Sequence, residues 1–307
     1  MLIKHLEYLA ALAHERHFAR AARACGVTQP TLSAGLKQLE ESTGVLLVER
    51  GQRFRGLTAE GERVLAWAQR ILADCESLTQ DVRAMQGELV GRLRIGAVPM
   101  ALPAISLLTT LVAARHPRVT ITVLSQTSAE IQRGLEDFSL DVGLTYLEGE
   151  PLPHLRMLPL YQERYLLLTP AAGALGQRAT VTWREAASVP LCLLTPDMQG
   201  RRIIDGYFRQ AGVAVQPSVE TNSLITVCSH LRAGRWSSVM PHTILYVVGE
   251  LEGTRAIPLV EPEAAETVGL IAPERNPLPP VTAALFEMLG GGEIAGVIER
   301  RAAGAAR

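Results

Sequence analysis

The sequence predicts an α/β protein in three parts: a winged helix-turn-helix over residues 1–58, a linker helix over 59–88, and a larger α/β domain over 89–307. Three observations support this division. Up to residue 86 the apolar residues recur mainly at helical spacing. After Gly87 and Gly91, short apolar runs alternate with helical patterns, which is typical of a doubly wound sheet. Finally, 307 residues exceed what one compact core usually holds.

Charge is unevenly distributed along the chain. The formal net charge is −1, so any nucleic-acid binding must be local. Residues 1–58 contain eight Lys and Arg against five Asp and Glu, whereas residues 59–90 contain three against six. Lys4 and Glu7 lie where a signal peptide would have its apolar core, and no apolar run approaches the ~20 residues of a membrane span. We therefore expect a cytoplasmic protein without a membrane partner.

Three short helices are predicted in the first part. One runs from Leu2 to His14 with an apolar face, and a second begins at Ala19 and is stopped by Gly26. Thr28 is placed to cap the third helix, whose first turn accommodates Pro30. The apolar residues of this helix recur three and four positions apart: Leu32, Leu36 and Leu39. This spacing predicts that one side of the third helix is buried.

The opposite side of the third helix is polar. It carries Gln29, Thr31, Ser33, Lys37 and Gln38. Such side chains bond base edges and phosphates when a helix enters the major groove. Because any surface helix has a polar side, an ordinary solvated helix remains an alternative. The segment Val45–Thr58 favours DNA binding, since two apolar runs flank a Gly-containing turn with three arginines, as in a wing that reaches phosphate or minor groove.

One long helix is predicted from Ala59 to Gln86. Its apolar positions alternate four and three residues apart: Val64, Ala68, Ile71, Cys75, Leu78, Val82 and Met85. Packing on its own domain is the alternative, but nothing adjacent in sequence could cover so long a seam. We therefore expect this helix to form a dimer, which would read two half-sites on DNA.

The second domain is expected to contain two α/β blocks built on a mostly parallel sheet. In the first block we expect strands at 93–98, 119–124 and 140–145 and helices at 103–116 and 128–137, the last capped by Ser128. In the second we expect strands at 165–169, 191–194, 218–221 and 237–240 and helices at 183–187, 201–211 and 223–233. A strand at 268–272 returns to the first block, and a helix at 280–289 closes the domain. Subdomain I would thus contain about residues 92–161 and 267–290, and subdomain II about 162–266.

The chain offers no pattern for catalysis or metal binding. No GxSxG, HExxH, GxGxxG or P-loop string occurs, the seven histidines are scattered, and the four cysteines form no CxxC pair. We therefore expect no enzyme, no cofactor and no metal site.

The first part resembles the N-terminal signature of LysR-type transcriptional regulators, without a gap over about the first 65 residues. The resemblance is carried by Ala21-Ala22, Val27–Ser33, Leu39–Glu41, Gly44, Leu47, Glu49-Arg50 and Leu57–Gly61. It implies DNA contacts from Thr28, Gln29, Thr31, Ser33 and Lys37 on the recognition helix, and from Arg50, Arg53 and Arg55 on the wing. It also implies a homodimer or homotetramer on a pseudo-palindromic promoter site, with RNA polymerase as a partner.

The second domain resembles the effector-binding half of the same family, which is similar to type-2 periplasmic binding proteins. The resemblance is carried by the two blocks and by Leu93–Ala97 and Asp141–Leu144. Ligands of such folds lie at the carboxyl ends of strands, near helix N-termini. This implies a small-molecule effector, a small carboxylate or other anion, held by Met100, Ser128, Thr145, Thr195, Arg201, Arg202 and Asn222. Met100 departs from the family, because many members carry Ser or Thr there.

Two alternatives stay open. The second domain alone would suit a solute-binding protein with no role on DNA, although the arginine wing and the lack of a signal sequence argue against this. The other is a redox-sensing regulator, because peroxide-sensing relatives use two cysteines in this half, where this chain has Cys192 and Cys228. Both lie in apolar settings, which favours buried structural cysteines.

Overall fold

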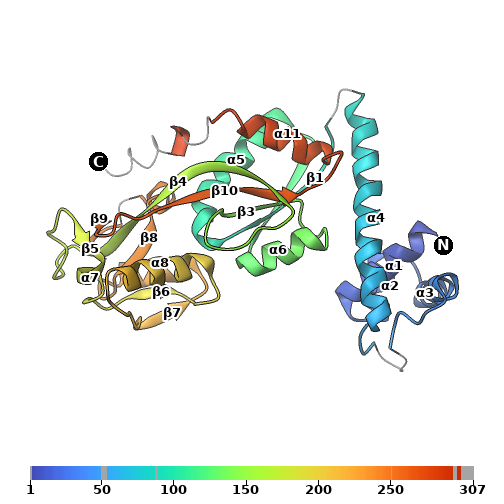
Figure 1. The fold of residues 1–307 in the computed structure, drawn as a ribbon, viewed down its shortest axis with the longest axis horizontal. Coiled ribbons are helices and arrows are strands. Elements are labelled where there is room, and N and C mark those ends of the chain that lie inside the picture. The colour runs from blue at the N-terminus through green and yellow to red at the C-terminus, as the bar shows by residue number, and fades with distance from the viewer. Residues whose placement is uncertain (1, 50–53, 87–88, 250, 293–295, 299–307) are drawn as a thin grey trace. The chain divides into compact units, whose positions relative to one another are not determined.

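The computed structural model describes residues 2–49, 54–86, 89–249, 251–292 and 296–298. The chain forms two compact units, residues 1–88 and 89–307, each of which is described on its own (Figure 1). No helix within the described residues is both long enough and apolar enough to cross a lipid bilayer.

The first unit is helical. Its helices are α1 (Ile3–Glu15), α2 (Phe18–Ala24), α3 (Gln29–Thr43) and α4 (Ala59–Ala84), which confirms the four predicted helices with small shifts at their ends. α1 packs against the other three. Their shared core contains Leu6, Tyr8, Leu9, Leu12, Leu32, Leu36, Leu39, Leu47, Leu65 and Ala68. Each buried leucine stabilises the unit by roughly 1.5–3 kcal/mol, so this small core holds all four helices together.

The turn between α2 and α3 follows from local chemistry. Gly26 has a φ of 65°, which favours glycine, and so the chain can reverse after α2. Thr28 caps α3, because its Oγ1 accepts a hydrogen bond of 3.3 Å from the backbone nitrogen of Thr31. Pro30 occupies the first turn, where its missing N–H leaves no bond unmade. The predicted start of this helix is thereby confirmed.

The base of the wing is tied to α3. Val48 and Leu57 form an antiparallel bridge, which is the pairing expected where two strands of a wing meet. The carboxylate of Glu40 on α3 accepts hydrogen bonds from the backbone nitrogens of Leu47 (2.8 Å) and Val48 (3.3 Å). The wing therefore leaves the helical core at a fixed point.

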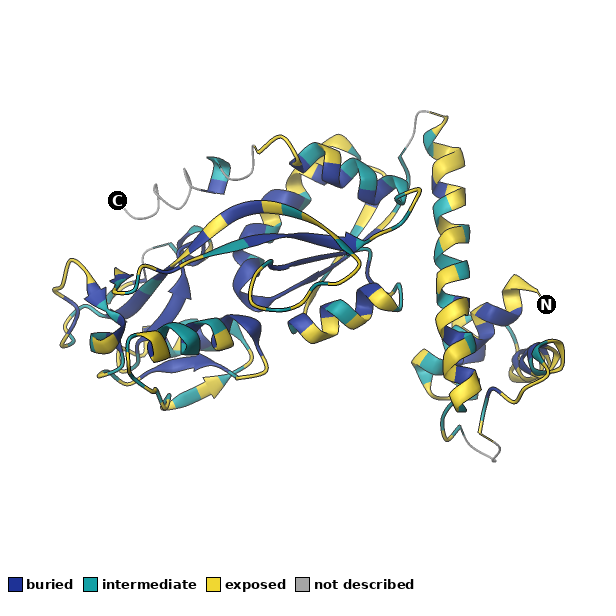
Figure 2. Ribbon diagram, in the orientation of Figure 1, coloured by how far each residue is buried: buried dark blue, intermediate teal, exposed yellow. Residues whose placement is uncertain are grey.

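α4 is buried along only part of its length. Leu65 and Ala68 belong to the core of the first unit. Further along the helix, Leu78, Val82 and Met85 are 65, 50 and 81% exposed (Figure 2). These three residues belong to the predicted apolar seam, and within the described residues nothing covers them.

The second unit contains a mixed sheet surrounded by helices. Its strands are β1 (Gly91–Ala97), β2 (Val119–Ser125), β3 (Val142–Tyr146), β4 (Leu155–Pro170), β5 (Val181–Thr182), β6 (Cys192–Leu194), β7 (Val219–Thr221), β8 (Ser238–Pro241), β9 (Thr254–Val260) and β10 (Ala265–Pro273). Its helices are η1 (Pro99–Ala101), α5 (Leu102–Arg115), α6 (Ser128–Glu136), α7 (Trp183–Ala186), α8 (Gln199–Gln210), α9 (Leu224–Arg232), α10 (Ile244–Val248) and α11 (Pro280–Leu289).

The main sheet has the order β2-β1-β3-β10-β4-β9-β5, with β8 also paired to β4, and β6 and β7 form a separate pair. β1, β2 and β3 are parallel, whereas β10 runs antiparallel to both β3 and β4. In Figure 1, α5 and α11 lie on one side of this part of the sheet and α6 lies on the other. The return of β10 to the first block is confirmed, but the sheet is mixed rather than mostly parallel.

Two long strands connect the two blocks. β4 has 16 residues, pairing first with β10 and then with β8 and β9. Only residues 165–169 of β4 were predicted, and β9 and α10 were not predicted at all. The subdomain boundaries expected near residues 161 and 267 both fall inside these long strands, and the division there stays a prediction.

Candidate functional site

The polar side of α3 faces outward. Thr28, Gln29, Thr31, Ser33 and Lys37 are all exposed. Lys37 lies 3.8 Å from Glu41, but an exposed pair of this kind contributes only about 0–1 kcal/mol, so the ammonium group is available to another anion. The structure therefore leaves the five predicted side chains of α3 free of the protein core.

A close helix contact fixes the position of α3. Gly35 lies on the buried side of the helix, where a Cβ atom would come within 2.6 Å of the ring of Tyr8 on α1. The absence of a side chain at Gly35 lets the two helices approach closely. Leu32 and Leu36 beside it are buried, which turns the polar residues of α3 to the outside.

The wing is described only in part. Arg55 is exposed. Arg50 and Arg53, the other two arginines predicted to contact DNA, lie outside the described residues. Their roles remain predictions.

The second unit gathers most of the predicted effector residues at the carboxyl ends of strands. Met100 follows β1, Ser128 follows β2, Thr145 is the next-to-last residue of β3, Thr195 follows β6, Arg202 lies in α8 and Asn222 follows β7. Met100, Ser128 and Thr145 are buried, whereas Asn222 is exposed. Thr195 has a buried hydroxyl oxygen without a hydrogen-bond partner in the described part of the chain.

α8 meets the first block through its first turn, which begins at Gln199 rather than at the predicted Arg201. The hydroxyl of Thr145 donates a hydrogen bond of 2.7 Å to Oε1 of Gln199, and both side chains are buried. A Cβ atom on Gly200 would lie 2.5 Å from the sulfur of Met100. Met100 thus fills the space beside α8 that a smaller hydroxyl residue would leave open. Gln199 was not singled out among the seven predicted effector residues.

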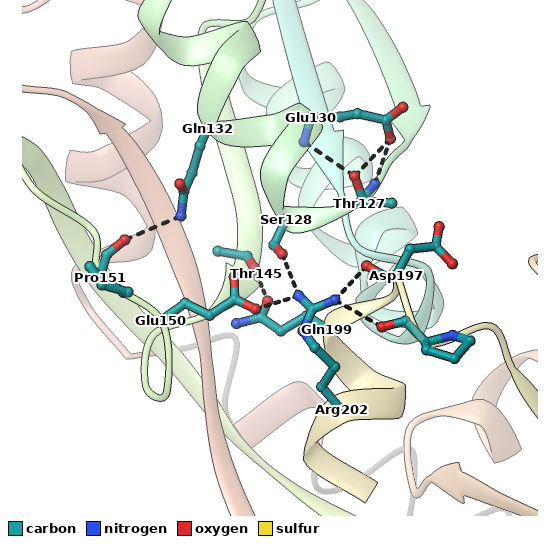
Figure 3. Close-up of polar contacts among 11 residues, drawn as sticks. Thr127, Ser128, Glu130, Gln132, Thr145, Glu150, Pro151, Asp197, Gln199 and Arg202 are labelled. Atoms are coloured by element: carbon teal, nitrogen blue, oxygen red, sulfur yellow. Dashed lines mark hydrogen bonds and ion pairs between the residues drawn. The ribbon is translucent and has the colours of Figure 1, made fainter. Parts of the chain in front are cut away.

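Arg202 connects α8 to two residues of the first block (Figure 3). Its Nη2 donates a hydrogen bond of 3.0 Å to the hydroxyl of Ser128 and pairs with the carboxylate of Glu150. Its Nη1 donates to the backbone oxygens of Pro196 and Asp197 at 3.1 and 2.5 Å. Two of the predicted effector residues, Ser128 and Arg202, therefore come together, with Glu150 as an unpredicted third member.

Ser128 is not the N-cap that the sequence predicted. The cap is Thr127, whose Oγ1 accepts from the backbone nitrogen of Glu130 at 3.2 Å, while the Glu130 carboxylate accepts from the backbone nitrogen of Thr127 at 2.9 Å (Figure 3). This reciprocal pair needs a glutamate three residues after the cap, which Thr127 has. The hydroxyl of Ser128 is thereby left to bond Arg202.

Arg201 lies in a different set of contacts from Arg202. Its Nε donates to Asp205 at 2.9 Å, and its Nη1 donates to the backbone oxygen of Leu194 and to Glu220, both at 2.6 Å. Burial lowers the pKa of this guanidinium, but the hydrogen bonds to Glu220 and Asp205 outweigh burial and leave the pKa raised. Arg201 thus fastens α8 to β6 and β7, and its contact with an effector stays a prediction.

A buried carboxyl group lies next to the cleft. Glu163 on β4 is fully buried, and it accepts hydrogen bonds from the hydroxyls of Tyr146, Tyr161 (3.2 Å) and Thr243 (3.4 Å). Burial raises its pKa to about 8, although the three hydroxyls oppose the rise. Because Tyr146 directly follows Thr145, this cluster is connected through the backbone to the cleft. The sequence analysis did not find it.

The two cysteines of the second unit lie in surroundings that disfavour the thiolate. Cys192 is completely buried and Cys228 is partly buried, and neither forms a disulfide. Burial raises the pKa of both thiols. A raised pKa lowers the fraction of thiolate, which is the form that reacts with peroxides.

Comparison with known proteins agrees with this architecture. Residues 3–62 match the family described as "Bacterial regulatory helix-turn-helix protein, lysR family", and residues 86–292 match the "LysR substrate binding domain". The chain is 33% identical over 249 residues to a "Probable hydrogen peroxide-inducible genes activator" of Streptomyces viridosporus, with 80% of this chain and 79% of that protein covered. It is 29% identical over 282 residues to the "DNA-binding transcriptional dual regulator OxyR" of Escherichia coli K12, with 91% of each chain covered.

Solved structures show the same fold. A full-length OxyR variant from Pseudomonas aeruginosa has a TM-score of 0.77 and 25% identity, covering 96% of this chain and 97% of that chain. CbnR complexed with its target DNA has a TM-score of 0.69 at 22% identity, covering 95% and 100%. With an N-terminal helix-turn-helix and an effector-binding domain that both match, this chain belongs to the LysR family of DNA-binding transcriptional regulators.

Proposed function

We propose that this regulator reads a promoter site with the exposed side of α3 and changes its hold on DNA when a small anion binds beside Arg202. The observation that carries this proposal is the polar side of α3, which has Gln29, Ser33 and Lys37 exposed above a buried leucine side. Side chains of this kind bond base edges and phosphates. In this proposal the chain is a cytoplasmic binding protein, not an enzyme.

A second copy of the chain would complete the DNA-reading form. In a dimer the exposed Leu78 and Val82 of α4 and its C-cap Met85 would pack against another α4, and their burial would hold the two chains together. The two helix-turn-helix units of such a dimer would fit a pseudo-palindromic site, and two dimers would form a homotetramer. Bending of the DNA by this assembly would alter access for RNA polymerase.

Gln29→Ala is expected to weaken binding to the specific promoter site by about 1–3 kcal/mol, roughly 5- to 150-fold, and to affect random DNA much less. The amide of Gln29 is exposed at the start of α3, where a helix in the major groove meets base edges. Gel-shift titration with the upstream region and with a scrambled duplex measures both affinities.

Lys37→Ala is the matched control from the same helix. Loss of a phosphate contact would weaken both duplexes by a similar factor and lower the salt dependence of binding. If Gln29→Ala weakened both duplexes equally, Gln29 would not read bases.

The effector part of the proposal rests on the pairing of Arg202 with Glu150. The carboxylate of Glu150 already forms an ion pair with the guanidinium of Arg202, beside the N-terminus of α6 and the hydroxyl of Ser128. A bidentate anion placed there would gain the same charge-assisted hydrogen bonds and the favourable end of the helix dipole. The anion would displace Glu150 and thereby change how α8 is held to the first block.

Glu150→Gln is expected to raise the affinity for a small carboxylate about 3- to 10-fold, since the competing charge is removed; the partial exposure of Arg202 keeps the gain modest. The amide still accepts a hydrogen bond from Arg202, so the fold is preserved. Isothermal titration of the full-length protein with mono- and dicarboxylates measures the change. Equal affinities in the wild type and Glu150→Gln would show that the anion binds elsewhere.

Peroxide sensing is the second candidate, because several relatives are named hydrogen peroxide-inducible genes activators. In this chain the thiols of Cys192 and Cys228 both have raised pKa values, which disfavours a thiol switch between them.

A further inference from the structure

A cavity of about 350 Å³ lies beside Arg202. Residues of α8 form one side of it, and the other side comes from Glu148 to Glu150, after β3, and from Glu266 on β10. The cavity therefore lies between the helix that carries Arg202 and the strands that connect the two blocks. Any ligand that occupies it would contact both.

The wall of this cavity is acidic. It contains three carboxylates, Glu148, Glu150 and Glu266, against the one guanidinium of Arg202, which is already paired with Glu150. Glu148 accepts a hydrogen bond of 2.8 Å from Thr267, and Glu266 accepts one of 2.7 Å from Tyr207. Neutral hydroxyls satisfy these oxygens without balancing their charge, and among the described residues neither carboxylate has an ion pair. Burial raises the pKa of Glu266; the hydrogen bond from Tyr207 opposes this rise, and the nearby charge of Glu148 adds to it.

A second observation points to a ligand with a hydrogen-bond acceptor. Gln199 lines the cavity and is only 3% exposed. Its oxygen is bonded to Thr145, whereas its amide nitrogen has no hydrogen bond within the described residues (Figure 3). The two N–H bonds of this amide are therefore available to donate to a ligand oxygen in the cavity.

The acidic wall suits an organic ammonium group better than a metal ion. Within the described residues, no group of three or more His, Cys, Asp or Glu side chains is arranged to hold a metal. Tyr207 also lines the cavity, and its ring is fixed by stacking on Trp183 at 5.1 Å between ring centroids. An aromatic ring beside carboxylates adds to the attraction for an ammonium group.

We propose that this cavity binds the ammonium group of an amino acid, whose carboxylate is held by Arg202 and the amide nitrogen of Gln199. The ammonium group supplies the positive charge that balances Glu148 and Glu266. The carboxylate takes the place of Glu150 on Arg202. This inference rests on the proposed anion site and identifies its effector as a zwitterion. A plain acid or a plain amine would make only one of the two charged contacts and would therefore bind more weakly.

The test is a binding series on the full-length protein. The probes are the twenty common L-amino acids and the ω-amino acids from 3-aminopropanoate to 6-aminohexanoate, each compared with the acid that lacks the amino group and the amine that lacks the carboxylate. Thermal shift selects the probes, and isothermal titration measures the affinities. We expect at least one amino acid to bind about tenfold or more tightly than both of its counterparts, since each carries only one of the two charges.

Two variants test where the ammonium group binds, and a third is their control. Glu266→Gln and Glu148→Gln keep an acceptor for Tyr207 and Thr267 but remove the charge, and each is expected to weaken binding of that amino acid about tenfold without weakening binding of the plain acid. Glu252→Gln removes an exposed carboxylate outside the cavity and should change neither. The inference is overturned if no amino acid binds more tightly than its plain acid, or if both cavity variants keep the preference. Plain acids that bind to the wild type but not to Arg202→Ala would then still support the proposed anion site.

Discussion

Gly61→Ala is expected to unfold or severely loosen the DNA-reading unit and to abolish promoter binding. Gly61 lies in the first turn of α4, where an added Cβ atom would come within 2.1 Å of the backbone oxygen of Leu47 and 2.9 Å of its carbonyl carbon. Backbone atoms cannot rotate away as the end of a side chain can. Overpacking in a rigid contact costs about 1–3 kcal/mol, and a clash with backbone belongs at or above the upper end of that range.

The damage would reach beyond α4, because Leu47 joins several parts of the unit. Its backbone oxygen accepts a hydrogen bond of 3.0 Å from Thr58, and Thr58 caps α4 by accepting one of 2.9 Å from the backbone nitrogen of Gly61. The side chain of Leu47 is fully buried in the core. To make room for a methyl group, either this core residue or the start of α4 must move.

Gly56→Ala is the matched control, because it adds the same methyl group at the base of the wing. There the nearest atoms, in the side chain of Glu49, would lie 3.7 Å away, which is ordinary contact. Urea unfolding of both variants, followed by gel shift on the promoter site, separates the two cases. A Gly61→Ala protein with the stability and affinity of Gly56→Ala would contradict the close packing of α4 on Leu47.

The helical unit could be predicted from sequence because its determinants are local. Gly26, Thr28 and Pro30 lie within five residues of one another and together define the turn and the start of α3. The leucine spacing then determines which side of that helix is buried. These residues alone predict the polar side of the recognition helix, because which residues are buried depends on neighbours three or four positions away.

β4 was harder to predict because tertiary pairing overrides its local pattern. Pro159, Gln162 and Glu163 interrupt the apolar run, so only the segment from residue 165 has the composition of a buried strand. Long-range pairing with β10 satisfies the backbone of the earlier half, and Glu163 is buried because tyrosine hydroxyls surround its carboxyl group. None of these partners is near in sequence except Tyr161.

The cleft was predicted in outline but not in its contacts. Parallel strands end at one edge, so Met100, Ser128 and Thr145 could be grouped by topology alone. The choice between Arg201 and Arg202 could not be made, because adjacent residues on a helix point in directions about 100° apart and the start of α8 was placed two residues late. The acidic wall also escaped prediction.

Glu163→Gln is expected to remove most of the pH dependence of stability of the second unit. The pKa of Glu163 is raised to about 8 by burial, against an ordinary value of 4.5. Between these pH values the unfolded chain has released a proton that the folded chain retains. The folded state therefore binds more protons, and the free energy of unfolding falls as pH rises through this window and levels off above pH 8.

The groups around Glu163 determine the size of this effect. Tyr146, Tyr161 and Thr243 donate hydrogen bonds to the carboxyl group, and Glu266 adds a like charge that favours the protonated form. Within the described residues, no hydrogen bond or ion pair brings a cation to this carboxyl group. Since one pKa unit corresponds to about 1.4 kcal/mol, the wild type should lose a few kcal/mol between about pH 5 and pH 8.

Urea unfolding of the full-length protein at several pH values measures this dependence in the transition of the second unit. Glutamine keeps an oxygen for the hydroxyl of Tyr146 and cannot ionise, so Glu163→Gln should be nearly flat over the same window. Glu252→Gln, an exposed carboxylate in the same unit, should retain the slope of the wild type. A slope unchanged in Glu163→Gln would mean that Glu163 is not the titrating group. A flat profile would instead establish that β4, which connects the two blocks, carries a neutral carboxyl group at Glu163. Ionisation of this group would disturb the packing around Tyr146. Because Thr145 directly precedes Tyr146, it would also disturb the hydrogen bond from Thr145 to Gln199.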